Sequence, residues 1–393
     1  MLFQPLLSKR RPVTVMNTNL SPDQREILVQ FRALIDKIIS PVADQWDREE
    51  TIPFEVIQTL AQQGLWGINI PENMGGQAWD MMTLGRICEE IGRGSASLLS
   101  LFTVHGMVAQ VLMKWGTHIQ KETWLPKLAK GHVLGAFALT EPDIGSDARR
   151  VETTAVLSGD VYVLNGKKKW ISCGQIAGLF LIVAQCDGKP SAFLVPKDTP
   201  GFSQEPIRDM LGFRSAMLAS LCLENCPVPR DNMVGVIGTG FSHVAGTALD
   251  HGRYCIAWGS VGLAQACLEA SVRYTHKRKQ FGVYLKEHQL IQEMIANMVS
   301  GTKAARLLCC HAGYLKDAGD PDMIMETAVA KYFASQNAVK VALDAVQIHG
   351  ANGCSGDYPV QRYLRDAKIM EIIEGSSQIQ QILIAGHGYQ VID

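Results

Sequence analysis

The sequence predicts a mostly helical α+β protein in which a small β-rich region separates two helical regions. The chain has 393 residues, more than one hydrophobic core usually holds, so two or three domains are expected. Long stretches near both ends carry apolar residues at helical spacing. Between them lie short β-forming segments separated by Gly, Pro, Asn and Asp, which is typical of strands and turns.

These differences divide the chain into four segments. We expect a disordered extension over residues 1–19, an N-terminal α-helical domain over 20–134, a middle β domain over 135–245 and a C-terminal α-helical bundle domain over 246–393. The last domain has long helices that are apolar on more than one side. This pattern predicts a bundle that also packs against other subunits.

The extension is basic. It contains Lys9, Arg10 and Arg11 and no acidic residue, as do mitochondrial transit peptides. We favour the simpler interpretation, a disordered start on a cytoplasmic protein, and keep a mitochondrial-matrix location as the alternative.

The first helical domain opens with a helix-start signal. Ser21 is a suitable N-cap, and Gln24 follows three residues later, which predicts a capping box. Apolar residues then recur over 27–39 along one stripe of a helix. In the middle domain, "KKKWIS" reads as a strand, and its lysines at 167–169 are expected on a solvated face.

Composition excludes several classes of function. A net charge of −1 gives no electrostatic case for nucleic acid or an anionic membrane surface. We find no apolar run approaching the roughly 18 residues of a membrane-spanning helix. The ten cysteines lack disulfide or metal-ligand spacing, so we expect free thiols and no metal site. G-x-G-x-x-G after a strand, the P-loop, H-E-x-x-H and G-x-S-x-G are absent from the sequence.

Four segments in order carry a family resemblance. They are "ALTEPDIGSDA", "NGKKKWIS", "RKQFG" with "HQLIQ", and "QIHGANGCSGDYPVQRYLRDAKIMEIIEGSSQIQQ". Together they resemble the acyl-CoA dehydrogenase family, from about residue 20 to the C-terminus. The resemblance implies that family's fold: an N-terminal helical domain, a middle β-barrel-like domain and a C-terminal four-helix bundle.

The resemblance also implies FAD as the cofactor. Trp170 would pack against the flavin ring, although its type and position also suit a core residue. The guanidinium of Arg278 suits the diphosphate. The loop after residue 139 would meet the flavin and the acyl thioester, and its alternative is an ordinary turn. The implied cofactor-binding residues are Phe137, Leu139, Thr140, Gly145, Ser146, Trp170, Ile171, Ser172, Arg278, Phe281, Gln289, Gln347, Gly350, Ala351, Ser376 and Gln378.

Oxidation of an acyl thioester requires a base for the α-proton and an acceptor for hydride. No side chain accepts hydride, so a flavin is needed. The base should be a carboxylate in a dry pocket. Most family members place it just before a Gly-Ser or Gly-Thr pair, which here is Glu374. One branch places it before an arginine on an earlier helix, but that position here is Gly252, which has no carboxylate.

The neighbouring acid, Glu371, is expected at the surface or in a salt bridge. Ser376 or Ser377 is expected to cap the next helix. The resemblance assigns a second set of residues to the substrate. These are Ser146, Asp250, Arg253, Ile373 and Gly375. For Asp250 and Arg253, the alternative is an i,i+3 ion pair.

The details of "IAWGSVGLAQAC" and "DAKIMEIIEGSS" are similar to a secondary-metabolism branch of the family. We therefore expect an acyl group on an acyl carrier protein in polyketide or nonribosomal peptide biosynthesis, for example a hydroxymalonyl extender unit. The alternatives are α,β-dehydrogenation of a short- or medium-chain acyl-CoA and a catalytically silent binding partner. The family also implies a homotetramer or homodimer with FAD at a subunit interface, reoxidised by oxygen or an electron-transferring flavoprotein.

Overall fold

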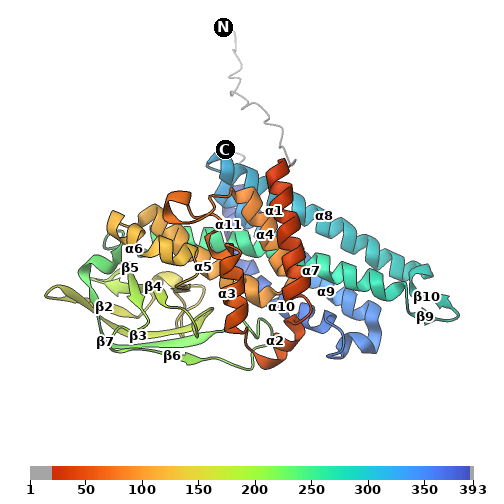
Figure 1. The fold of residues 1–393 in the computed structure, drawn as a ribbon, viewed down its shortest axis with the longest axis horizontal. Coiled ribbons are helices and arrows are strands. Elements are labelled where there is room, and N and C mark those ends of the chain that lie inside the picture. Colours follow the sequence, from red (N-terminus) through yellow and green to blue (C-terminus); the bar gives the residue numbers. More distant parts are fainter. Residues whose placement is uncertain (1–19, 390–393) are drawn as a thin grey trace, which may run out of the picture.

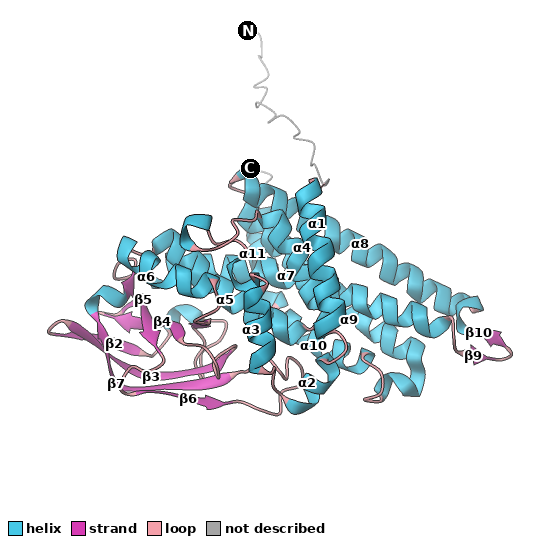
Figure 2. Ribbon diagram, in the orientation of Figure 1, coloured by secondary structure: helices cyan, strands magenta, loops and turns pink. Residues whose placement is uncertain are grey.

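A computed structural model describes residues 20–389, and the extension predicted over 1–19 lies outside this range. Helices form most of the molecule; strands β2–β7 gather at one end, and a small hairpin, β9–β10, lies at the other (Figures 1 and 2). The order of a helical part, a sheet and a second helical part confirms the predicted fold class.

The first helical part begins as the sequence predicts. Ser21 caps the first helix, and it forms a full capping box with Gln24. Its helices are α1 (Pro22–Leu34), the π-helical η1 (Ile35–Ile39), α2 (Ala43–Glu49), α3 (Phe54–Gln62), α4 (Met81–Gly94), α5 (Ala96–Trp115) and α6 (His118–Ala129), with short 3-10 turns η2 (Leu65–Gly67) and η3 (Glu72–Met74).

The middle part is one eight-stranded, mainly antiparallel sheet. Its strand order is β6-β7-β3-β2-β4-β5-β8, and β1 pairs in parallel with β4. The elements are β1 (Gly135–Ala138), η4 (Ala148–Arg150), β2 (Thr154–Ser158), β3 (Val161–Ile171), β4 (Leu179–Cys186), β5 (Lys189–Pro196), β6 (Phe202–Pro206), β7 (Ala219–Pro229), η5 (Arg230–Asn232) and β8 (Met233–Val234).

The C-terminal part is a bundle around α7. Its elements are the π-helical η6 (Gly240–Ala245), α7 (Gly246–Thr275), the hairpin β9 (Lys279–Gln280) and β10 (Val283–Tyr284), η7 (Leu285–Glu287), α8 (Gln289–Ala318), α9 (Met323–His349), η8 (Gly350–Cys354), α10 (Val360–Ile372) and α11 (Ser377–Gly388). Helix α7 packs against α8, α9 and α10 in this part, and against α4 and α5 of the first part.

Glycines allow α4 and α7 to cross closely. A Cβ on Gly262 would lie 1.9 Å from the backbone oxygen of Glu89, and one on Gly92 would lie 2.5 Å from the backbone oxygen of Gly259. Contacts this short leave no room for a side chain on either helix. The close crossing joins the two helical parts, so they share one core.

Within residues 20–389, two helices are long and apolar enough to cross a membrane, contrary to the sequence-based expectation. They are Ala96–Trp115 and Gly240–Thr275. However, 89% and 78% of their most apolar windows are buried inside the protein, as in core helices. Their apolar character is therefore used in packing the interior.

The lysines of "KKKWIS" do not share one environment. Lys167 is exposed, but Lys168 is fully buried and its Nζ lies 2.7 Å from Oε1 of Glu141. The predicted solvated face is therefore wrong for Lys168, because alternate residues of a strand point to opposite faces of the sheet.

Among the described residues all ten cysteines are free thiols, which confirms the prediction of free thiols made from their spacing.

We predict that Gly262→Ala lowers the stability of the protein by about 1–3 kcal/mol, because the added methyl group forces α4 and α7 apart. The change is measured as a fall in the midpoint of thermal unfolding. Gly386→Ala is the matched control, because Gly386 is helical, exposed and has no heavy atom within 4 Å of a Cβ. Its midpoint should stay level or rise. Equal losses in both variants would contradict the close crossing.

Candidate active site

Glu374 and Gly375 form a tight turn, and the predicted helix cap at Ser376 follows it directly. Helix α10 ends at Ile372, and α11 begins after Ser376, whose side chain accepts a hydrogen bond from the Ile379 N–H at 3.4 Å. Between them, Glu374 has φ of 57° and Gly375 has φ of 91°. A non-glycine residue in this left-handed region is strained and persists only where its surroundings hold it.

The Glu374 carboxylate lies against Gly252 of α7. A Cβ on Gly252 would lie only 2.3 Å from Glu374 Oε2. The residue as a whole is partly exposed, yet Oε2 is buried without a hydrogen-bond partner. Burial raises the pKa of Glu374 from its ordinary value of 4.5 to about 7, although the positive charges of Arg253 and Lys331 oppose this rise.

Side-chain donors from three neighbouring helices hold the backbone of the turn. Arg253 Nε donates to the Glu374 carbonyl at 3.1 Å, and Gln380 Nε2 donates to the same oxygen at 3.2 Å. Lys331 Nζ donates to the Gly375 carbonyl at 2.9 Å. The Glu374 N–H forms no hydrogen bond within residues 20–389, so it can donate to a substrate carbonyl.

The predicted flavin residues of the middle part lie together at the end of β3. The Lys169 N–H donates to the Thr140 carbonyl at 3.0 Å, which places the loop after β1 beside this strand. Trp170 is 43% exposed and has φ of 63°, at an irregularity in the pairing of β3 with β7. Phe137 and Leu139 are buried, whereas a Cβ on Gly145 would meet nothing within 4 Å.

Helix α5 connects this group to Glu374. Ser100 Oγ donates to Ser172 Oγ at 2.9 Å. A Cβ on Gly106 would lie 2.3 Å from Nε2 of His251, the residue before Gly252. Six residues of helix span about 9 Å. The end of β3 and the carboxylate region therefore lie within about two helical turns of each other along α5.

A second group of predicted cofactor residues lies elsewhere. Its members Arg278, Phe281, Gln289, Gln347, Gly350 and Ala351 are all exposed. The β9–β10 hairpin, which carries Phe281 at its two-residue turn, projects at the opposite end of the molecule from strands β2–β7 (Figures 1 and 2). One chain therefore does not bring both groups to a single flavin.

Tyr274 contacts both segments that carry this second group, the one before the hairpin and the end of α9. Its backbone oxygen accepts from the Arg278 N–H at 3.0 Å, and its hydroxyl accepts from Asn352 Nδ2 at 2.9 Å. Its ring also stacks on His349, just before Gly350. The hairpin and the end of α9 thus form one surface with an exposed guanidinium and an exposed aromatic ring.

The two groups have the chemistry that FAD requires. Near β3, the exposed Trp170 ring offers a stacking face for the flavin, and Thr140 and Ser172 at this end of the strand carry hydroxyl groups. Ser146 is exposed on the loop after β1. The guanidinium of Arg278 suits a diphosphate. The residues present therefore fit the cofactor. Ser376 borders the Glu374 turn, while Gln378 is exposed on α11.

The residues predicted to bind the substrate do not all lie at the Glu374 turn. Arg253, Gly375 and Ile373 lie at or beside the Glu374 turn. Asp250 instead pairs with Lys316 of α8 at 2.5 Å, so the alternative i,i+3 ion pair with Arg253 is wrong. Asp250 Oδ1 is buried without a partner. A long-range partner 66 residues away has no signal in the local sequence.

Glu371 forms a salt bridge with Lys368 at 2.7 Å, which confirms its predicted surface role. Two residues beside the turn, Lys331 and Gln380, are not predicted from the sequence, and both are fully buried. The sequence around Lys331 does indicate that this lysine is buried. It stands in "AVAKYFA", where apolar and small residues flank it on a helix that packs on both sides.

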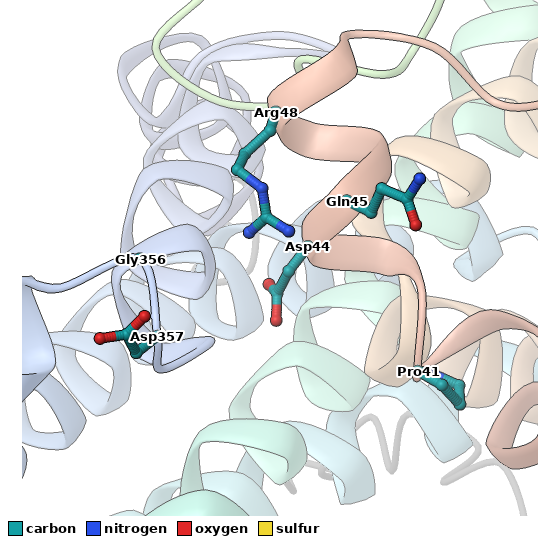
Figure 3. Close-up of a pocket in the computed structure, with 6 residues that line it drawn as sticks. All are labelled: Pro41, Asp44, Gln45, Arg48, Gly356 and Asp357. Atoms are coloured by element: carbon teal, nitrogen blue, oxygen red, sulfur yellow. The ribbon is translucent and has the colours of Figure 1, made fainter.

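The structure has a polar surface pocket of about 590 Å³ elsewhere (Figure 3). It lies between α2 and the segment before α10, and Pro41, Asp44, Gln45, Arg48, Gly356 and Asp357 line it. None of these is a predicted site residue, and Asp44 pairs with Arg362 at 2.6 Å. Over residues 20–389, no group of three or more His, Cys, Asp or Glu side chains is placed to hold a metal ion.

The raised pKa of Glu374 predicts a pH-dependent stability. The pKa of Glu374 rises from 4.5 to about 7 on folding, so the protonated carboxyl stabilises the folded protein. This contribution to stability is fully present below pH 4.5, and it is lost as the pH rises through 7. Glu374→Gln is neutral at every pH and lacks this loss. We expect the thermal midpoint of the variant to rise relative to the unaltered protein between pH 5 and pH 8.

Glu371→Gln is the control for this measurement, because it neutralises a carboxylate of α10 that is paired at the surface. A pH-dependent difference as large as that of Glu374→Gln would show that the effect does not arise at the turn.

Comparison with known proteins agrees with this geometry. The acyl-CoA dehydrogenase N-terminal, middle and C-terminal domains match residues 21–132, 136–226 and 238–388. The chain is 41% identical to the acryloyl-CoA reductase (NADH) of Anaerotignum propionicum, over 96% of this chain and 97% of that protein. It is 38% identical to the mitochondrial short-chain specific acyl-CoA dehydrogenase of Rattus norvegicus, over 96% and 93%.

Solved structures are similarly close. The butyryl-CoA dehydrogenase of Megasphaera elsdenii has a TM-score of 0.91 at 33% identity, over 95% of this chain and 99% of that chain. The prolyl acyl carrier protein oxidase AnaB has 0.89 at 31%, over 94% and 99%. A glutaryl-CoA dehydrogenase from Mycobacterium smegmatis, in complex with FADH2, has 0.88 at 30%, over 93% and 94%. The chain belongs to the acyl-CoA dehydrogenase family of FAD-dependent oxidoreductases, which act on acyl thioesters.

Proposed function

We propose that this protein catalyses the α,β-dehydrogenation of a short-chain acyl-CoA. The observation that carries the proposal is the Glu374 carboxyl, which is buried against Gly252 with an unpartnered oxygen and a pKa of about 7. Such a group is half ionised near neutral pH, as a general base should be. The names of the relatives add the substrate class: acryloyl-CoA, short-chain acyl-CoA and butyryl-CoA.

The chain's own residues divide the work of the reaction. The ionised Glu374 takes the α-proton, while its free N–H donates to the thioester carbonyl and stabilises the negative charge that develops there. Arg253 and Gln380 hold the turn so that both groups face the substrate. FAD, when bound, supplies the acceptor for the β-hydride. Trp170, Ser172 and Thr140 would hold it at the end of β3.

A carrier-protein substrate is the second candidate. It is supported by the similarity to AnaB, a prolyl acyl carrier protein oxidase, at 31% identity. The acyl-CoA relatives are more similar in sequence, so they favour CoA over a hydroxymalonyl carrier protein. The two thioesters place the same reacting atoms at Glu374, and they differ only in what lies beyond the pantetheine arm.

We also propose that two copies complete each flavin site, in a cytoplasmic homotetramer or homodimer. On one chain, the β9–β10 hairpin lies at the opposite end of the molecule from strands β2–β7, which supports this. An electron-transferring flavoprotein is the proposed partner for reoxidation. A chain from a solved structure on the electron transferring flavoprotein of Acidaminococcus fermentans supports this, with a TM-score of 0.91 at 36% identity.

We predict that butyryl-CoA bleaches the flavin absorbance of the purified protein in a single turnover. Octanoyl-CoA and butyryl carrier protein, run beside it, should react at least about tenfold more slowly. Glu374→Gln should lower the rate constant by about a hundredfold or more, because the proton acceptor is lost, and Glu371→Gln should not. A colourless protein that takes up no FAD would refute the dehydrogenase function, and faster reduction by the carrier protein would favour the second candidate.

We predict that Gly252→Ala lowers the rate of flavin reduction by about a hundredfold, because its methyl group displaces the Glu374 carboxylate. FAD content should be unchanged. Gly246→Ala is the matched control on the same helix, since its Cβ would meet only the Phe241 carbonyl, at 3.7 Å. An unimpaired Gly252→Ala protein would place the base elsewhere.

A further inference from the structure

Lys331 is a fully buried lysine in the first half of α9, and it contacts the Glu374–Gly375 turn. Its ammonium donates to the Gly375 carbonyl at 2.9 Å and to the Glu371 carbonyl at 3.4 Å. No carboxylate forms a salt bridge with it among the described residues. A buried charge is normally paired, so a lysine held only by backbone carbonyls requires an explanation.

We propose that Lys331 is a positioning residue for the base: it fixes the left-handed Glu374–Gly375 turn and keeps the Glu374 carboxylate ionised at neutral pH. This inference rests on the proposed function, because it assigns a role to a group that acts on the same carboxylate. Lys331 contacts the backbone of the turn, and it acts through these contacts.

Lys331 helps to fix the shape of the turn. The turn places two consecutive residues at positive φ, and one of them is not glycine. Its carbonyls at 374 and 375 accept from Arg253 of α7, Lys331 of α9 and Gln380 of α11. Three different helices therefore converge on two peptide groups. Of the three donors, Lys331 is the only one that binds Gly375 without also binding Glu374.

Lys331 also places a positive charge near the Glu374 carboxylate. The groups that face Glu374 are Arg253, His251 and Cys255 from α7 and Lys331 from α9, while α11 contributes the uncharged Gln380. Glu371 of α10 also faces Lys331. Burial lowers the pKa of Lys331 to about 8, and Glu374 is the strongest influence in the opposite direction. Lys331 is therefore still cationic at pH 7, where it stabilises the Glu374 carboxylate.

The test uses the purified holoenzyme with Lys331→Met, which removes the charge, and Lys331→Arg, which keeps it. Lys331→Gln, which keeps an amide donor without charge, serves the same purpose if Lys331→Met does not fold. Lys340→Met is the matched control, because Lys340 is an exposed lysine of the same helix. The rate constant for flavin reduction by butyryl-CoA is measured from pH 6 to pH 9.

We expect Lys331→Met to be at least about fivefold slower than the unaltered protein at pH 7, and within about twofold of it at pH 9, because more alkaline pH restores the carboxylate. Lys331→Arg should keep the original pH profile, as should Lys340→Met. A loss by the same factor at every pH would reduce Lys331 to a structural role and overturn the proposal, as would an unchanged profile.

A measurement that needs no turnover separates this proposal from the proposed function. The thermal midpoint of the protein is compared with that of Glu374→Gln across pH, first with Lys331 present and then in the Lys331→Met background. The difference should start to grow at the same pH in both backgrounds, but the pH at which it stops growing should move upward when Lys331 is absent. If it stays in place, the proposal fails even when butyryl-CoA reduces the flavin. If it moves and no acyl-CoA reacts, only the proposed function fails.

Discussion

The burial of one carboxylate constrains the rest of the active site. Glu374 reaches α7 from a left-handed backbone conformation, and its carboxylate has space there because residue 252 is glycine. The strained turn in turn needs donors from α7, α9 and α11. Those helices are brought together by the close crossing of α7 with α4 and by the bundle around it. The packing of the whole C-terminal part thus determines where a single proton acceptor lies.

Local signals in the sequence predicted local features well. The capping box of Ser21 and Gln24, the cap at Ser376 and the surface pairing of Glu371 each depend on residues within a few positions of one another. The family resemblance supplied Glu374, and the absence of a side chain at 252 agreed with it. Both are statements about residue type at a position, which a sequence records directly.

What the sequence did not predict depends on partners distant along the chain. Lys168 can be buried because it pairs with Glu141, which lies 27 residues earlier in the chain. Asp250 pairs with Lys316 on the next helix. Lys331 binds carbonyl groups, which every residue possesses, so residue type alone gives no sign of its partner. The left-handed conformation of Trp170 follows from an irregularity in strand pairing, which local propensity does not encode.

The contact between Glu374 and Gly252 also limits how the site can change. A Cβ at 252 would lie 2.6 Å from the carboxyl carbon of Glu374, so the space between α7 and the turn accommodates one carboxylate, from 252 or from 374, but not two. Moving the base to α7 would require the loss of the side chain at 374 first, or at the same moment. Single substitutions that follow this path pass through a protein with no base, which separates the two arrangements by an inactive intermediate.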